Sequence, residues 1–159
     1  MHTRIATLLL GFLALTVHAA GQTVTAANPA SLVSALKAAG FGATLGVATT
    51  GNPQIHVTSG TNAYTLDLMD CVNHVRCVEI VYSARWSSVK NITPAQINAR
   101  WSQRYNTNVV VFVDTDGALA AVTTMFTEPG GIPAGVFISN LRGWMSSTDN
   151  AYTHIVQGK

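Results

Sequence analysis

Two apolar runs joined by a tight turn constrain the fold of this chain more than any other feature. Residues 109–113 (VVVFV) are all β-branched or aromatic, residues 114–117 (DTDG) have the composition of a turn, and residues 118–126 (ALAAVTTMF) form a second apolar run. Strands that are apolar on nearly every residue are typical of strands buried on both faces. The pattern therefore predicts a β-hairpin at the centre of a sheet.

The chain has 159 residues, which is enough for one domain with a proper core and too few for two domains of ordinary size. Only 10% of the residues are charged, whereas an ordinary soluble domain has about 25%. The formal net charge of +2 supplies no basic stripe to neutralise phosphates, so nucleic acid is not an expected partner. The composition also gives no reason to expect electrostatic attachment to a membrane.

The N-terminus has the pattern of a cleaved signal peptide. Residues 1–4 are positively charged, residues 5–17 are apolar and uncharged, and Val17 and Ala19 suit the −3 and −1 positions of a cleavage site. The apolar run is shorter than the roughly 20 residues of a transmembrane helix; an uncleaved N-terminal anchor is the alternative. We expect a signal peptide at 1–19, a mobile spacer at 20–27 and one domain at 28–156. The mature protein would be periplasmic or secreted, without a stable membrane anchor.

Cys71 and Cys77 are the two cysteines of the chain. In an oxidising compartment an isolated pair is most simply a structural disulfide, which here would join the ends of two adjacent antiparallel strands. Use in redox chemistry or metal binding is the alternative. The CxxxxxC spacing does not match a thioredoxin motif, and His74 alone nearby makes a poor zinc site.

Hydrophobic periodicity and turn residues predict the element order α-β-β-β-β-α-β-β-α. Asn28 and Pro29 are typical of a helix start, and Gly40 is typical of a helix end. Thr93 and Gln96 fit a capping box at the start of the middle helix. The predicted fold class is α+β, with an antiparallel sheet and helices mainly on one face. The predicted helices span 29–39, 94–105 and 133–156, and the predicted strands span 43–48, 54–58, 63–70, 78–86, 109–113 and 118–126. The polar stretch at 146–150 predicts that the last helix is either frayed or kinked there.

No motif in the sequence names a reaction. Residues 114–117 begin like a calcium loop but lack the glutamate that should close it, so a hairpin turn is the expected role. His56, His74 and His154 lie in separate predicted elements without metal-ligand spacing. The chain contains no G-x-S-x-G nucleophile elbow. We therefore expect no catalytic residues, no cofactor and no metal.

A few other residues could contact a ligand. Gly130 and Gly131 precede the last helix and could cradle an anion there, although a structural turn is the simpler role. Arginines at 100, 104 and 142 could form a small basic patch, although charges of this kind more often lie on solvated helix faces. Large apolar residues on two helices and one strand form a candidate binding surface if they are not core residues: Trp86, Trp101, Phe137, Leu141 and Trp144.

Several short features occur in a defined order over residues 28–155. They are 28–29 (NP), 39–41 (AGF), 51–53 (GNP), 97–98 (IN), Trp101, 104–105 (RY), 114–117 (DTDG), 130–132 (GGI), Leu141 and Trp144. In this order and spacing the chain resembles the YbjN-domain family, described as bacterial sensory transduction regulators. The resemblance implies a fold like that of type III secretion chaperones, with a helix, a meander, a helix, a hairpin and a long last helix. It implies no catalytic residues, and the leader and the cysteine pair would make this chain an exported member.

The leading functional hypothesis is an exported, non-enzymatic regulatory or protein-binding module. It would bind a protein or peptide through a sheet face or a helix groove, and it could form a homodimer. The first rival is a small-molecule or lipid binder with a pocket between the last helix and the sheet, lined by Phe137, Leu141 and Trp144. The second rival is a hydrolase, which would need two of the three histidines and an acid to converge in one cleft. The histidines are His56, His74 and His154, and the acids are Asp67, Asp70 or Glu79.

Overall fold

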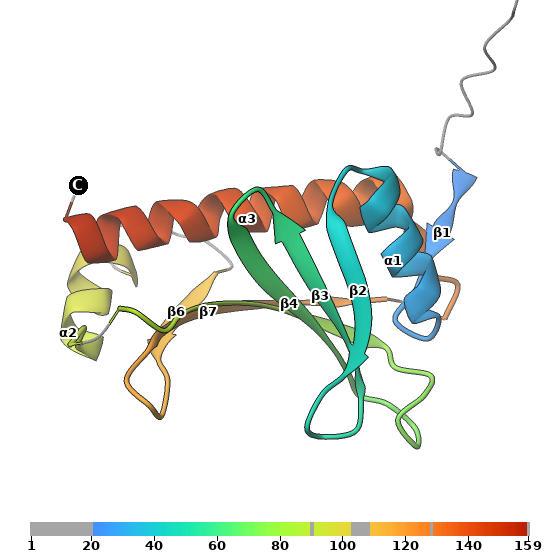
Figure 1. The fold of residues 1–159 in the computed structure, drawn as a ribbon, viewed down its shortest axis with the longest axis horizontal. Helices are drawn as coiled ribbons and strands as arrows, with labels where there is room; N and C mark the ends of the chain where they lie inside the picture. The colour runs from blue at the N-terminus through green and yellow to red at the C-terminus, as the bar shows by residue number, and fades with distance from the viewer. Residues whose placement is uncertain (1–20, 90, 103–108, 128, 159) are drawn as a thin grey trace, which may run out of the picture.

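The computed structural model describes residues 21–89, 91–102, 109–127 and 129–158, and it has the α+β architecture that the sequence predicts (Figure 1). A six-stranded sheet has the strand order β2-β3-β4-β5-β7-β6, and a second sheet pairs β1 with β8. All strand pairs are antiparallel. The elements are β1 (Thr23–Val24), α1 (Pro29–Ala38), β2 (Gly42–Val47), β3 (Pro53–Ser59), β4 (Asn62–Met69), β5 (Glu79–Trp86), α2 (Pro94–Ile97), the π-helix η2 (Asn98–Ser102), β6 (Val110–Val113), β7 (Leu119–Phe126), β8 (Ile132–Pro133) and α3 (Ala134–Gln157).

The first four strands of the large sheet form the predicted meander. Each of β2, β3, β4 and β5 pairs with the next one along the chain. Alternation along a strand sends successive side chains to opposite faces, and Tyr64, Leu66 and Leu68 of β4 are buried as predicted. Their intervening neighbours are half-buried, so one face of the meander carries the core.

The hairpin formed by β6 and β7 lies at one end of the sheet, and its predicted place at the centre is wrong. Strands β4 and β5 occupy the centre, and β6 is an edge strand. Val110 is 60% exposed and Phe112 is 38% exposed. The unbroken apolar run therefore does not mark burial on both faces. It arises because β6 carries apolar side chains on its uncovered face as well as on its core face.

Helices α1 and α3 cover one face of the large sheet, as predicted, and α3 runs along its whole width (Figure 1). The buried residues of α3 meet the aromatic side chains of the central strands. The ring of Tyr82 lies 6.5 Å from that of Phe137 and 5.6 Å from that of Trp144. Helix α3 continues without a break through the polar stretch at 146–150. Within the described residues, none of the helices combines the length and apolarity that a membrane crossing requires.

The short helix α2 begins with the predicted capping box. The hydroxyl of Thr93 accepts a hydrogen bond from the amide of Gln96 at 3.2 Å, and the side-chain oxygen of Gln96 accepts one from the amide of Thr93 at 2.8 Å. The chain then continues as the π-helix η2 rather than as the α-helix that was predicted. Ile97 and Trp101 pack with Ile155 of α3 in a second, smaller core. The predicted continuation to Tyr105 lies outside the described residues.

The segment between the predicted leader and α1 belongs to the fold, so the prediction of a mobile spacer is wrong for residues 21–27. Strand β1 pairs with β8, and Val24 and Ala26 are completely buried. The amide of Ala26 donates a hydrogen bond to the hydroxyl of Thr127 at 3.0 Å, which ties this segment to the end of β7. Two buried residues among small polar ones give no periodicity that a sequence pattern could detect. The predicted leader lies outside the described residues.

Cys71 and Cys77 form the predicted disulfide, with their sulfur atoms 2.07 Å apart. The bond closes a small hairpin between β4 and β5. Within it, the amide of Val72 donates to the carbonyl of Val75 at 2.8 Å, and the amide of Val75 donates to the carbonyl of Val72 at 3.1 Å. Asn73 and His74 at its tip have φ of 52° and 59°. We call residues 71–77 the disulfide loop.

Replacing both Cys71 and Cys77 by serine is expected to lower the free energy of unfolding by about 2 kcal/mol, because the closed loop restricts the unfolded chain. Urea denaturation of the oxidised wild type and the double variant measures this difference. Reduced wild type is the matched control and should resemble the variant. Two free thiols on alkylation of the denatured, non-reduced wild type would show that the bond does not form.

Candidate functional site

Four of the five residues expected to form a binding surface are core residues. The exposed fractions of Trp101, Phe137, Leu141 and Trp144 are 3%, 0%, 0% and 3%. They cannot contact a partner, so the prediction that they form a surface is wrong for these four. Trp86 is half-buried, and its ring lies 5.3 Å from that of Tyr152. The large aromatic residues Trp101, Phe137 and Trp144 are therefore packing residues.

The face of the large sheet that points away from α1 and α3 has no covering helix among the described residues (Figure 1). We call it the open face. Strand alternation and register assign its residues, because partners across an antiparallel pair project to the same side. Core residues such as Leu66 and Tyr82 lie on the other side. The open face includes Gln54, His56, Asp67, Met69, Glu79, Val81, Arg85, Val110, Phe112, Val122 and Phe126.

The half of the open face on β6 and β7 is mostly apolar, with Thr124 as an exposed polar residue between Val122 and Phe126. Val110 lies opposite Val122, and Phe126 lies opposite Glu79 of β5. Phe126 is 62% exposed, although phenylalanine is usually a core residue. Exposed apolar side chains gathered on one face of a sheet are typical of interaction surfaces. Their signal in the sequence is the loss of strict alternation in the two apolar runs, a pattern that fits an exposed apolar face as well as burial on both faces.

The other half of the open face contains a cavity of about 380 Å³. Residues 47–50, from the end of β2 and the following turn, form one side of it. Met69 and Val81 contribute apolar lining, and Gln54 and Asp67 contribute polar lining. The amide of Gln54 donates a hydrogen bond to Asp67, its cross-strand partner. The cavity therefore combines an apolar lining with one carboxylate of fixed orientation.

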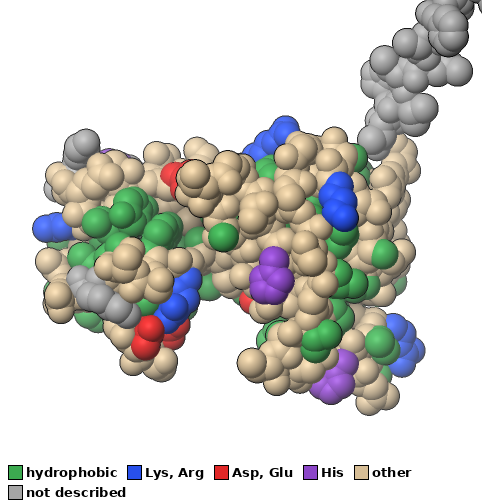
Figure 2. Space-filling model, viewed as in Figure 1, with side chains coloured by type: hydrophobic (Ala, Val, Ile, Leu, Met, Phe, Trp, Pro, Cys, Tyr) green, Lys and Arg blue, Asp and Glu red, His purple; other side chains and the backbone are tan. Residues whose placement is uncertain are grey.

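Two groups of loops project beyond the open face, and Figure 2 shows a hollow between them. One projection is the turn between β6 and β7. The other comprises the β2–β3 turn and the disulfide loop (Figure 1). In the second projection, Nδ1 of His74 lies 2.8 Å from the side-chain oxygen of Asn52, so a hydrogen bond joins the two loops. Val72 and Val75 of the disulfide loop are 51% and 56% exposed.

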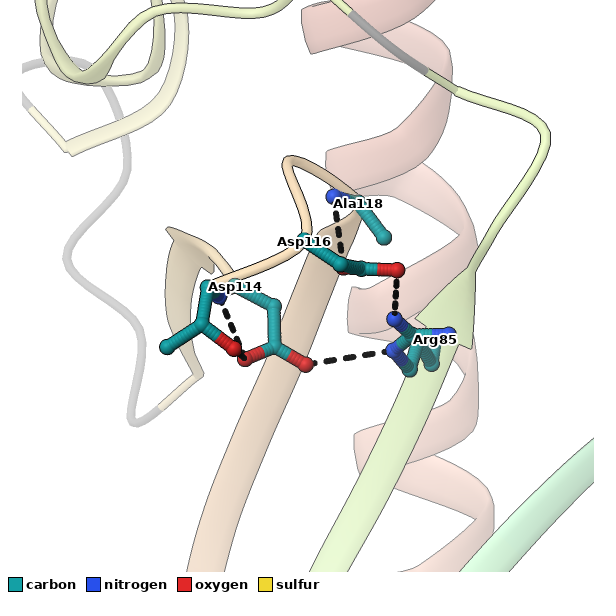
Figure 3. A network of polar contacts seen from close by, with 5 residues as sticks. Arg85, Asp114, Asp116 and Ala118 are labelled. Atoms are coloured by element: carbon teal, nitrogen blue, oxygen red, sulfur yellow. Dashed lines mark hydrogen bonds and ion pairs between the residues drawn. The ribbon is translucent and has the colours of Figure 1, made fainter.

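The β6–β7 turn is held by a network around Arg85 (Figure 3). Nε of Arg85 lies 3.2 Å from a carboxylate oxygen of Asp114, and its guanidinium also pairs with Asp116. The second oxygen of Asp116 accepts a hydrogen bond from the amide of Ala118 at 3.1 Å. Both carboxylates are therefore engaged in shaping the hairpin turn, which is the role that the sequence predicts for residues 114–117.

The same network shifts the ionisation of its members. The amide of Thr115 and then the guanidinium of Arg85 donate hydrogen bonds to Asp114, and they lower its pKa. Hydrogen bonds to Asp116 and Asp114 raise the pKa of Arg85. All three groups are solvent-exposed, so these ion pairs orient the turn and add little to stability.

The three histidines lie on three different parts of the molecule. His56 is on the open face of β3, His74 is in the disulfide loop, and His154 is on α3, with its ring 6.3 Å from that of Trp101. Within the described ranges, no group of three histidine, cysteine or acidic residues could hold a metal ion.

The other candidate ligand-binding residues make structural contacts. Arg100 donates to the carbonyl of Ile155 at 2.6 Å, and Arg142 donates to that of Ala39 at 3.1 Å. Arg104 lies outside the described residues. Gly131 is in a turn against β1, where the carbonyl of Val24 lies close to its Cα hydrogens, so this turn packs on the chain itself.

Comparison with known proteins finds no match to a protein-family model, to a curated protein or to a solved structure.

Proposed function

We propose that this chain is an exported, non-enzymatic regulatory module of the YbjN kind, which binds a protein or peptide through the open face. The observation that carries the proposal is the exposure of Val110, Phe112 and Phe126 on a sheet face that none of the described helices covers. Burying such residues against a partner is favourable, at about 25 cal/mol for each Å² of apolar surface. Apart from the short strands β1 and β8, the element order is also the one that the family resemblance implies.

Export of the chain is supported by the leader pattern at 1–19 and by the disulfide. The N-terminal sequence of protein recovered from the envelope or medium should begin at Ala20. Recovery of a chain that begins at Met1 would overturn the cleavage.

The alternative of a ligand pocket between α3 and the sheet has less support. Phe137, Leu141 and Trp144, which would line it, fill that space themselves. The ring of Trp144 lies 5.6 Å from those of both Tyr64 and Tyr82. A pocket for a drug-sized ligand needs several hundred Å³. Opening such a volume here would displace these side chains and disrupt the core.

Face-selective capture tests the proposal. Immobilised, oxidised protein lacking residues 1–19 is exposed to envelope extract of its native host. Val110→Lys places a charge on the open face and should abolish saturable capture, because it leaves a charge to be desolvated at the interface. Val136→Lys is the matched control, since Val136 is 48% exposed on α3, which covers the other face. Equal capture by both variants would exclude the open face as the binding surface.

A further inference from the structure

Charges are unevenly distributed over the open face. Asp67 and Glu79 lie on its central strands, β4 and β5. Arg85, the one lysine or arginine within the strands, already pairs with Asp114 and Asp116 at the edge of this face. Asp67 and Glu79 therefore have no lysine or arginine on the described strands to balance them, and this part of the sheet presents two carboxylates to a partner.

Asp67 and Glu79 are also close to each other. Asp67 lies opposite Val81, and Glu79 lies opposite Met69, so the two carboxylates are diagonal neighbours on adjacent strands. Such neighbours have Cα atoms roughly 7–8 Å apart. Both side chains are half-buried, as are Met69 and Val81. A cationic group above this part of the sheet could contact both acids.

The cavity beside Asp67 has the chemistry to receive a long basic side chain. Val47, Met69 and Val81 provide apolar lining, and Asp67 provides a carboxylate. Lysine and arginine bury an aliphatic stem against apolar surface while their charged group stays hydrogen-bonded. Arginine can also pair with a carboxylate through two parallel hydrogen bonds. An acidic side chain would meet repulsion in the same place.

We propose that the partner segment on the open face is an extended peptide with at least one arginine or lysine and with apolar residues two positions away from it, on the same face of the peptide. The basic side chain enters the cavity and pairs with Asp67 and Glu79. The apolar residues pack on Phe126, which lies directly across from Glu79, and on Val122 and Val110 beyond it. This inference rests on the proposed function and adds the chemical class of the partner.

Binding of synthetic peptides tests this class. The probes are three fluorescein-labelled heptapeptides with threonine at every even position, valine at positions 1, 3 and 7, and arginine, glutamate or threonine at position 5, so that the valines and the test residue share one face. Each is titrated into the oxidised protein lacking residues 1–19, at low salt, and followed by fluorescence anisotropy. The arginine peptide should bind, and its affinity should fall as salt is added, because exposed charges are screened. The glutamate peptide should not bind, and the threonine peptide should bind more weakly than the arginine peptide.

Matched charge variants locate the site. Asp67→Asn combined with Glu79→Gln should weaken binding of the arginine peptide about tenfold, the equivalent of about 1.4 kcal/mol. Asp149→Asn combined with Asn150→Lys makes the same change in net charge on α3, which covers the other face of the sheet, and should leave the affinity within about twofold. Thermal unfolding confirms that both double variants are folded.

The outcomes separate this inference from the proposed function. Equal weakening by the two double variants would show general attraction to a cation and would overturn the inference. The same holds if the threonine peptide binds as tightly as the arginine peptide. In either case, loss of capture in Val110→Lys would still support binding through the open face. A dimer in sedimentation that Val110→Lys dissociates, with no peptide binding, would identify a second copy as the occupant and would overturn the cationic peptide.

Discussion

Replacing Phe137 by alanine is expected to lower the free energy of unfolding by about 3–5 kcal/mol. The side chain is completely buried between α3 and the large sheet, where its ring lies 6.5 Å from that of Tyr82. Its removal loses apolar burial and leaves a cavity that a close-packed core cannot fill. Chemical denaturation monitored by circular dichroism measures the loss.

The neighbouring residue provides the control for this substitution. Val136 is 48% exposed on the same helix, so Val136→Ala should change stability by no more than about 0.5 kcal/mol. If Phe137 were part of a binding surface, its truncation would leave stability unchanged. A loss below about 1 kcal/mol would therefore contradict its assignment to the core.

Local chemistry explains which parts of the fold were predictable. The capping box at Thr93, the turn at 114–117 and the four-stranded meander each depend on residues that are close in sequence. The disulfide was predictable for a similar reason, because two cysteines separated by five residues have one simple pairing. These features needed no knowledge of how distant segments pack.

Strand order was not predictable, because it depends on contacts between distant segments. Strand β7 pairs with β5 on one side and with β6 on the other, which moves β6 to the edge. An apolar run such as 109–113 is compatible with a central strand that is buried on both faces. It is also compatible with an edge strand that exposes apolar side chains on one face. The exposure of Val110 distinguishes these two cases, and exposure requires coordinates.

The candidate site was also not predictable, because it too depends on contacts between distant segments. Phe137 and Trp144 were considered for a surface because they are large and apolar, yet they are buried. The sequence offers Asp67 and Glu79 only as acids that a hydrolase would need. Their proximity follows from the register of β4 against β5, which pairs Asp67 with Val81 and Glu79 with Met69. The spacing of these residues along the chain does not predict that register.

Substitution of Gly131 is the second change with a large expected effect on stability, because the turn that contains Gly131 packs against β1. Its φ is +75°, a conformation that costs other residues about 1–3 kcal/mol. A Cβ atom here would lie 2.6 Å from the carbonyl oxygen of Val24 and 2.5 Å from Cγ2 of Thr23. Strand β1 would have to separate from β8, which would expose the buried Val24.

Gly131→Ala is therefore expected to lower the free energy of unfolding by more than about 2 kcal/mol. It should also speed hydrogen exchange at the amides of β1 and of the segment that leads into α1. Gly130→Ala is the matched control, because a Cβ at Gly130 would meet nothing within 4 Å, and its stability should stay within about 0.5 kcal/mol of the wild type. If the two alanine variants are equally stable, β1 does not pack against this turn. In that case residues 21–27 would be the mobile spacer that composition alone suggests.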